Sequence, residues 1–557
     1  MTWTQNFQPI ANSIELSALV AAIPILILFY MLGIRRSTGS LAAGLGLASA
    51  LVIAIVGFSM PVNLAISATL NGVLFGIFPI VWIVITSVWI YHMTVESGEF
   101  EIIANSLASI TEDRRLQALF IAFAFGAFLE GTAGFGTPVA ITAAMLVGLG
   151  FNPIYAASIC LVANTAPVAF GAIGIPIVVG GQVSGLDPML ISKIVARQLP
   201  LLSFIVPLWI VVMMCGWRRA MEVLPAVIVA GVCFAGTQFI TANYISPYLP
   251  DITSAIVTII GLGIFLSIWQ PSNIWRFPSE LPSAAGRIRL QYSPKEVLRA
   301  WAPYIILAVL VFLWADNHLL KFKNVLLDLE STLGLTTIDW PGLHNMIVRA
   351  YPVVPLDASR AQALYPATFS INFLSAAGTS IFLAGLLSAF IIPNYGFMKA
   401  FNCLFKTIKL LLFPISTIGM VIGLAYIMNY SGMSSTLGLA FTDTGRLFPF
   451  FAPFLGWLGV FLTGSDTSAN ALFGSMQKTA AQQLGIDPGL TVAANTDGGV
   501  CGKMISPQSS SIACAAIRKV GEEGTIFRSV LGHSIAMLLF IAVLTFLQAH
   551  TLHWMLP

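Results

Sequence analysis

The fold is decided by a stretch that occurs twice in the chain. The first copy reads GAFLEGTAGFGTPVA from Gly126 and continues to LVANTAPVAFGAIGIP, which ends at Pro176. The second reads GVFLTGSDTSANALF from Gly459 and continues to VAANTDGGVCGKMISP, which ends at Pro507. Both copies are apolar runs interrupted by glycine, proline and small polar residues. In a membrane protein, interrupted runs at corresponding places in two halves indicate a transport site between those halves.

The composition is that of a protein embedded in a lipid bilayer. Of the 557 residues, 57% are hydrophobic and only 9% are charged, whereas soluble domains have about 25% charged residues. Because so few charges cannot cover a water-facing surface, the sequence predicts an all-α polytopic membrane protein. Its apolar runs predict about 12–14 transmembrane helices, and the shorter runs are expected to form re-entrant hairpins. No basic segment precedes the first run, so we expect a retained helix and not a cleaved signal.

Basic residues predict how the chain is oriented. Arg35 and Arg36 follow the first apolar run, and later basic clusters recur at loops that alternate with it. The excess of basic residues in cytoplasmic loops therefore places both termini outside the cytoplasm. Similar runs that begin at Phe78-Pro79 and Phe413-Pro414 would then cross in opposite directions. The two halves are accordingly predicted to be inverted-topology repeats.

The repeats divide the chain into three parts. Residues 1–269 form the N-terminal half, whose repeat core is 72–215. Residues 369–557 form the C-terminal half, whose repeat core is 408–547. Between them, 270–368 is expected to supply a cytoplasmic segment, one helix and an external loop.

Several classes of function are excluded or disfavoured by missing patterns. The six cysteines and six histidines have no metal-ligand spacing, so neither a metal site nor a disulfide framework is expected. No basic patch with interleaved aromatic residues indicates a nucleic-acid partner. GTAGFG differs from the dinucleotide fingerprint and no phosphate-binding loop motif occurs, so no cofactor is expected. A membrane-embedded enzyme is disfavoured because no nucleophile motif with a base is present.

Ionisable residues within apolar runs are the strongest candidates for function, because each costs about 2.5–3.5 kcal/mol at a helix centre. Glu130, Asp466, Asp497 and Lys503 all lie in the repeated stretches. Burial of a carboxylate disfavours its charged form, so the three acids are candidates to carry a coupled proton. Glu130 could equally accept hydrogen bonds from the glycine-rich turn, Asp466 could cap a helix, and Lys503 could extend to the interface.

Small polar residues and glycines beside the interruptions are the candidates for substrate binding. Asn-Thr pairs recur in both copies, and the glycines and prolines after them, including Gly498, Gly502 and Pro507, are expected to break the helices there. Broken helices expose N–H groups that hold a small anion. The predicted substrate-binding residues are Thr132, Gly134, Asn164, Thr165, Ser465, Thr467, Asn470, Asn495, Thr496, Lys503, Ser506 and Gln508.

Long motifs across almost the whole chain resemble the lactate permease family of bacteria. The motifs are GAFLEGTAGFGTPVAITAAMLVGLGF, NTAPVAFGAIGIP, PFLGWLGVFLTGSDTSANALF and GKMISPQSSSIACAA. The resemblance implies an inner-membrane symporter that takes up L-lactate, and often D-lactate and glycolate, with a proton. It also implies that the GTAGFG and GSDTSAN turns are hairpin tips and that the two Asn-Thr turns are helix breaks. In an inner membrane, the orientation predicted from the basic residues makes both termini periplasmic. The family commonly has threonine at Asp497, which makes Asp497 a weaker proton carrier than Glu130 or Asp466.

The sequence thus predicts a secondary transporter whose partners are a small 2-hydroxy monocarboxylate, a proton and the lipid bilayer. A sodium-coupled carboxylate carrier of the same architecture is the alternative. Assembly into a homo-oligomer is compatible with both.

Overall fold

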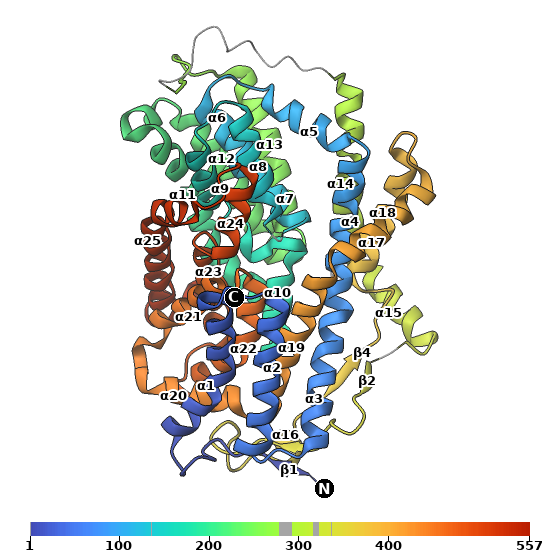
Figure 1. The fold of residues 1–557 in the computed structure, drawn as a ribbon, viewed down its shortest axis with the longest axis vertical. Helices are drawn as coiled ribbons and strands as arrows, with labels where there is room; N and C mark the ends of the chain where they lie inside the picture. The colour runs from blue at the N-terminus through green and yellow to red at the C-terminus, as the bar shows by residue number, and fades with distance from the viewer. Residues whose placement is uncertain (1, 135, 278–291, 316–321, 336) are drawn as a thin grey trace.

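Apolar helices make up most of the structure (Figure 1). The computed structural model describes residues 2–134, 136–277, 292–315, 322–335 and 337–557. Several helices in the first half begin at a polar side chain that caps them. Ser13, Thr38, Asn152 and Asp187 each accept a hydrogen bond from a backbone N–H of the first turn, which satisfies a donor that has no partner within the helix.

The first half of the chain forms one series of helices, and the first copy of the repeated stretch lies near the end of this series. Its elements are α1 (Ile14–Phe29), η1 (Tyr30–Ile34), α2 (Gly39–Val52), η2 (Ile53–Gly57), α3 (Val62–Phe75), η3 (Gly76–Val81), α4 (Trp82–Glu96), α5 (Glu99–Ala108), α6 (Arg114–Ala118), η4 (Leu119–Phe125), α7 (Gly126–Thr132), α8 (Thr137–Gly148), α9 (Pro153–Ala163), η5 (Val168–Phe170), α10 (Gly171–Ser184) and α11 (Pro188–Met221). Two further helices, α12 (Leu224–Tyr244) and α13 (Pro250–Ile268), follow before the second series.

The second half forms a similar series of helices together with short strands. Its elements are α14 (Pro294–Trp314), α15 (Phe322–Thr332), α16 (Arg360–Ala363), α17 (Ala377–Ile391), α18 (Gly396–Leu410), α19 (Leu412–Ser431), α20 (Met433–Ala440), η7 (Phe441–Leu447), α21 (Phe448–Thr463), α22 (Asp466–Gln483), α23 (Pro488–Lys503), α24 (Pro507–Ala516), α25 (Glu523–His550) and η8 (His553–Met555). Two short sheets complete it. β1 (Trp3–Thr4) pairs in parallel with β3 (Ile347–Val348), and β2 (Thr337–Asp339) pairs antiparallel with β4 (Thr368–Ser370).

The two series contact each other reciprocally. α2 and α3 pack against α19, while their counterparts α17 and α18 pack against α4. α10 packs against α22 and α24 against α8; in the same way α11 packs against α23 and α25 against α9. Contacts of this kind, in which each member of a pair meets the other's counterpart, are typical of two units related by a two-fold axis. They support the predicted repeats, and the placement of that axis in the membrane plane stays a prediction from the basic residues.

The correspondence extends beyond the predicted repeat cores. α1 packs against α2 and α20, and α14 packs against α17 and α5, which makes α14 the counterpart of α1. A Ser-Gly pair precedes both α5 and α20, and the backbone at Gly98 and Gly432 is left-handed, with φ of 82° and 92°. Only glycine adopts this conformation without a steric cost. The second repeat thus includes a helix from the segment predicted as a connection.

Ten helices in the described ranges are long and apolar enough to cross a membrane, or eleven if a bent pair is counted as one span. This number is smaller than the 12–14 transmembrane helices predicted from the sequence, because several of the apolar runs form short helices. α8, at Thr137–Gly148, and α17, at Ala377–Ile391, are too short to pass the same test. α22 and α23 are mostly buried in protein and tolerate polar residues. These two helices are surrounded mainly by other helices of the protein and not by lipid.

Both repeats contain a helix break immediately before the matched proline. In the first, α9 and the η5–α10 segment meet at an angle of 67°, and Ala172 to Gly174 have a left-handed backbone before Pro176. In the second, α23 ends at Lys503 and α24 begins at Pro507. The breaks support the predicted broken helices.

The expectation that Gly498 and Gly502 interrupt the second helix is wrong. α23 is continuous through both residues and through the Asn495-Thr496 pair. A Cβ atom at Gly498 would lie 1.9 Å from the carbonyl oxygen of Pro453, and one at Gly502 would lie 2.3 Å from that of Trp457. These glycines therefore allow α21 to approach α23 closely, which is a common role of small residues between membrane helices.

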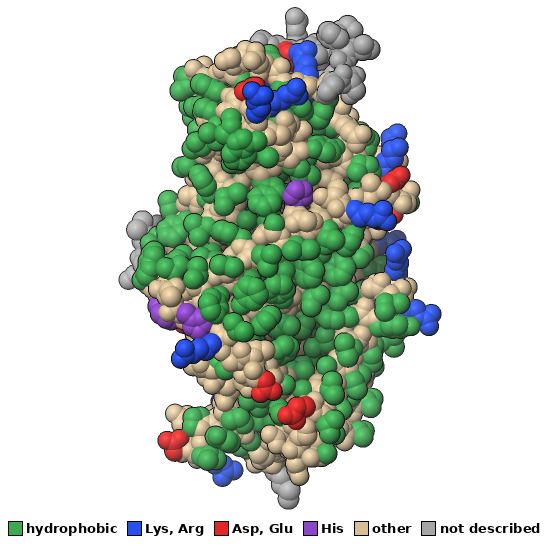
Figure 2. Space-filling model, turned by 90° about the vertical axis from the view of Figure 1, so that its left-hand side faces the viewer, with side chains coloured by type: hydrophobic (Ala, Val, Ile, Leu, Met, Phe, Trp, Pro, Cys, Tyr) green, Lys and Arg blue, Asp and Glu red, His purple; other side chains and the backbone are tan. Residues whose placement is uncertain are grey.

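Hydrophobic side chains cover the middle of the surface in Figure 2, and charged side chains gather toward its top, its bottom and one edge. The exposed apolar residues include Leu19, Val56 and Ile264 on α1, η2 and α13. An apolar band between charged ends fits the lipid bilayer, where a charged side chain is costly.

Candidate functional site

A buried ion pair joins the two repeats. The ammonium nitrogen of Lys503 lies 2.5 Å from Oε1 of Glu130, and the two side chains are 11% and 3% exposed. Glu130 comes from α7 in the first repeat, and Lys503 is the last residue of α23 in the second. Both helices lie in the middle of the molecule (Figure 1). Two of the four predicted ionisable residues thus pair directly.

Glycine makes room for the glutamate at the first helix break. A Cβ atom on Gly171 would lie 2.6 Å from Oε1 of Glu130, so the carboxylate rests against the backbone at the start of α10. Its second oxygen, Oε2, is buried and has no hydrogen-bond partner among the described residues. The carboxylate is therefore held by one cation and has one oxygen that can bind a proton.

A small hollow lies beside the ion pair. Its lining consists of apolar side chains from both repeats, one cation and two small polar residues: Leu161, Asn164, Thr165, Val168, Val500, Lys503 and Met504. It has no room for a water-sized sphere. The two helix breaks contribute to its wall, so movement of the breaks would change its size.

Two polar atoms in this wall have no partner. Oδ1 of Asn164 and Oγ1 of Thr165 are buried and make no hydrogen bond within the described chain. An unpaired buried polar group costs about 1–3 kcal/mol, so a ligand that pairs with both would be stabilised. Together with Lys503 they offer one positive charge, one acceptor and one hydroxyl. This set matches a small carboxylate that also has a hydroxyl group.

The corresponding Asn-Thr pair of the second repeat, unlike the first, has hydrogen-bond partners for its side chains among the described residues. Nδ2 of Asn495 donates to Oδ1 of Asn470 at 2.8 Å, and Oγ1 of Thr496 donates to the same oxygen at 3.1 Å. Nδ2 of Asn470 in turn donates to the carbonyl of Pro176 at 3.0 Å. These three predicted binding residues therefore hold α22, α23 and α10 together.

Asp466 and Asp497 lie deeper in the second repeat. Asp466 is 4% exposed and Asp497 is 0% exposed, and none of their four carboxylate oxygens has a partner in the described residues. A Cβ atom on Gly499 would lie 2.2 Å from Oδ1 of Asp466. Ser465, not Asp466, accepts the capping hydrogen bond at the start of α22, from the N–H of Ser468. The carboxyl of Asp466 is thus left without the capping role that its sequence allowed.

The other predicted residues are placed at the turns around the site. Thr132 donates to the carbonyl of Phe128, and Gly134 lies in the first hairpin tip with φ of 58°. Ser506 caps α24 by accepting from the N–H of Ser509. Thr467 is partly buried, and exposed Gln508 packs against Gly464 in the second hairpin tip. These residues shape the turns and do not line the hollow.

The sequence pattern missed Asp251. This residue lies in the first turn of α13, outside both repeated stretches, and is 1% exposed. A Cβ atom on Gly131 would lie 2.7 Å from Cβ of Asp251, which places the acid next to α7. The signal that could have revealed it is a single acid at the start of a long apolar run.

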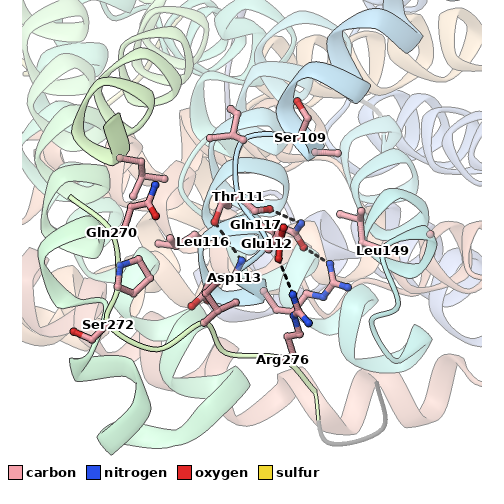
Figure 3. A pocket seen from close by; sticks show the side chains of 17 residues that line it. Ser109, Thr111, Glu112, Asp113, Leu116, Gln117, Leu149, Gln270, Ser272 and Arg276 are labelled. Atoms are coloured by element: carbon pink, nitrogen blue, oxygen red, sulfur yellow. Dashed lines mark hydrogen bonds and ion pairs between the residues drawn. The ribbon is translucent and has the colours of Figure 1, made fainter. Parts of the chain in front are cut away.

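A larger cavity, of about 590 Å³, lies away from this site (Figure 3). It is lined by the loop before α6 and by residues that follow α13. Its charged groups are paired: Arg276 binds Glu112 at 2.7 Å, and Arg114 donates to Oε1 of Gln117 at 2.6 Å. None of the predicted site residues contributes to it. Its size alone does not make it the candidate site.

The chain matches known proteins along nearly its full length. The family model described as L-lactate permease matches residues 17–552. The chain is 48% identical over 571 residues to glycolate permease GlcA of Escherichia coli K12, and 46% identical over 576 residues to an L-lactate permease of Bacillus subtilis. It is also 48% identical over 567 residues to an L-lactate permease of Escherichia coli K12. In all three comparisons the match covers 100% of both chains. These relatives are named as permeases and not as enzymes.

Proposed function

The chain belongs to the L-lactate permease family, and from this premise we propose that it carries lactate or glycolate across a bacterial inner membrane together with a proton. The observation that supports the proposal is the Glu130–Lys503 ion pair beside a hollow with unpaired polar atoms. Two relatives of nearly equal identity are named for different 2-hydroxy acids. The proposal therefore covers both substrates.

Each chemical group of such a substrate has a matching side chain in the wall of the hollow. The carboxylate would bind the ammonium of Lys503, and the hydroxyl would donate to Oδ1 of Asn164. The hydroxyl of Thr165 would donate to a carboxylate oxygen. Leu161, Val168 and Val500 would surround the methyl group of lactate. Bonds between charged groups are about twice as strong as neutral ones, so Lys503 supplies most of the binding energy.

Proton coupling follows from charge balance at the ion pair. Without substrate, Lys503 and Glu130 neutralise each other. When the substrate carboxylate replaces Glu130 at Lys503, a charged Glu130 would be left buried without a partner. A buried acid in this position takes up a proton instead of remaining charged. Each substrate anion therefore enters with one proton, and the loaded site stays neutral.

A change of conformation must accompany binding because the hollow has no room even for a water-sized sphere. The wall contains both helix breaks, at Thr165 and Met504. Their backbone lacks the continuous hydrogen bonds of a helix, so these segments are where movement costs least. Alternate opening toward the two sides of the membrane would complete the cycle of a secondary transporter.

The test compares wild-type chain and Glu130→Gln in proteoliposomes. Glutamine is neutral, so Lys503 should hold the substrate anion without any need for a proton. Exchange of labelled lactate for unlabelled lactate should persist, while net uptake driven by a pH gradient falls at least tenfold. Repeating wild-type uptake with potassium in place of sodium separates proton from sodium coupling. Net uptake by Glu130→Gln at the wild-type rate, or a strict need for sodium, would contradict the proposal.

A further inference from the structure

Asp251 is a buried acid without a partner beside the ion pair. Both of its carboxylate oxygens are buried and make no hydrogen bond within the described residues. As the second residue of α13 it lies near the helix N-terminus, where the helix dipole favours negative charge. That effect is about 0.3–1 kcal/mol, far less than the cost of burying an unpaired carboxylate. Asp251 is therefore held with its proton bound.

The surroundings of Asp251 link it to Glu130. Asp251 packs against Gly131, the residue that follows Glu130. The charged groups that interact with it electrostatically are Glu130 of α7 and Lys503 of α23. The other helices that pack closely on α13, namely α12, η4 and α10, contain no charged residue. Of the cysteine and tyrosine side chains near α13, Cys233 lies against Gly261 and Tyr244 is 71% exposed, while Tyr248 in the loop before α13 packs against the hydrophobic core.

The loop before α13 also touches the first helix break. A Cβ atom on Gly174 would lie 2.1 Å from the carbonyl oxygen of Pro247. The position of Asp251 is therefore tied to the break that forms one wall of the hollow. Asp251 thus lies on a helix outside both repeated stretches and still contacts the first of them.

We propose that Asp251 is a proton-carrying residue that supplies the proton taken up by Glu130 when substrate binds. The O–H bond of the Asp251 carboxyl breaks, and the proton forms a new bond to Oε2 of Glu130, which has no other partner. Asp251 is then protonated again from water on one side of the membrane. Together, these two steps and substrate binding bring one proton and one substrate anion to the site, so the net charge of the site does not change. This inference rests on the proposed symport of the same site.

The test measures net uptake and exchange of labelled lactate for Asp251→Asn in proteoliposomes. Asparagine has nearly the same shape but cannot release a proton. Net uptake driven by a pH gradient should fall at least tenfold, whereas exchange should stay within about twofold of wild type, because a protonated Glu130 need not release its proton during exchange. The matched control is Ser254→Ala, which removes a buried, unpaired hydroxyl one turn along α13 and should leave both rates unchanged.

The outcomes separate the inference from the proposed function. If wild type accumulates lactate with a pH gradient and Asp251→Asn does so equally, Asp251 carries no proton. Equal loss of net uptake and exchange would show that Asp251 has a packing role and overturn the inference as well. If wild type itself fails to couple to protons, the proposed function fails and this inference with it. Should Asp251→Asn not reach the membrane, Asp251→Glu carries the test: it should shift the pH of half-maximal net uptake but not of exchange, and an unshifted profile would contradict the role.

Discussion

Among single residues, chemically identical side chains at matching places in the two repeats have different partners. Asn164 and Asn495 stand at matching places in the repeats, yet Asn164 has an unpaired oxygen in the wall of the hollow and Asn495 is bound to Asn470. The sequence predicted both as binding residues because it showed the repetition and not the neighbours. A hydrogen-bond network between α22 and α23 depends on which rotamers meet, and spacing along the chain does not contain that information. The pairing of Glu130 with Lys503, 373 residues apart, was likewise outside the reach of the sequence.

Lys503 should be essential for binding of the substrate anion. Lys503→Met is expected to abolish both net uptake and exchange of labelled lactate, since removal of one partner of a buried ion pair costs about 3–5 kcal/mol and also removes the anion's partner. The matched control is Lys406→Met. Lys406 pairs with Glu96 at 2.7 Å, but the side chains are 67% and 41% exposed, and such pairs contribute about 0–1 kcal/mol.

Asn164 should select substrates with a hydroxyl group. We expect wild type to prefer lactate over propionate, which lacks the hydroxyl, in competition against labelled lactate. Asn164→Leu should reduce this preference about tenfold, because the acceptor for the hydroxyl is lost and one such bond contributes about 1 kcal/mol or more. Asn495→Leu, which disturbs the network between α22 and α23, should lower the yield of folded protein without changing the preference. An unchanged preference in Asn164→Leu would remove Asn164 from the binding site.

At the scale of helices, the sequence predicted most of the architecture and misplaced some of its breaks. Apolar runs predicted most of the helices, and the family resemblance implied the turns that the structure places at Gly134 and Gly464. The continuity of α23 through Gly498 was not predicted, because a glycine that breaks a helix and a glycine that admits a neighbour look alike in sequence. The choice depends on α21, which fills the space beside α23. α1 and α14 also have corresponding contacts, although the two helices share no sequence motif.

Close contact between α21 and α23 should be sensitive to a single methyl group. A Cβ atom at Gly456 would lie 1.7 Å from the carbonyl oxygen of Asn495. Gly456→Ala is therefore expected to destabilise the protein by about 1–3 kcal/mol, the usual cost of overpacking, measured by thermal unfolding in detergent. Gly532→Ala on α25 meets no atom within 4 Å and should leave the unfolding temperature unchanged or slightly higher. Equal unfolding temperatures of the two variants would show that this contact is not tight in solution.

At the scale of the whole molecule, a nearly symmetric frame contains an asymmetric site. The helices of the two repeats pack reciprocally, but the buried glutamate belongs to the first repeat and the buried lysine to the second. Symmetry of the frame allows two equivalent openings, one toward each side of the membrane, as expected for inverted repeats. In the proposed cycle, the buried Glu130–Lys503 pair between the repeats handles one substrate and one proton in either opening.

The most direct test of this account is the lactate ratio at which net flux stops in proteoliposomes, measured at a series of pH differences and membrane potentials. One proton per lactate anion moves no net charge, so the equilibrium ratio should change tenfold for each pH unit, about 1.4 kcal/mol. It should be the same at 0 and at 100 mV. Transport of net charge would instead shift the ratio by about 2.3 kcal/mol per charge for 100 mV, roughly 50-fold. A lactate ratio that changes with voltage, or that does not change with pH, would contradict the proposal that the substrate carboxylate replaces Glu130 as the partner of Lys503.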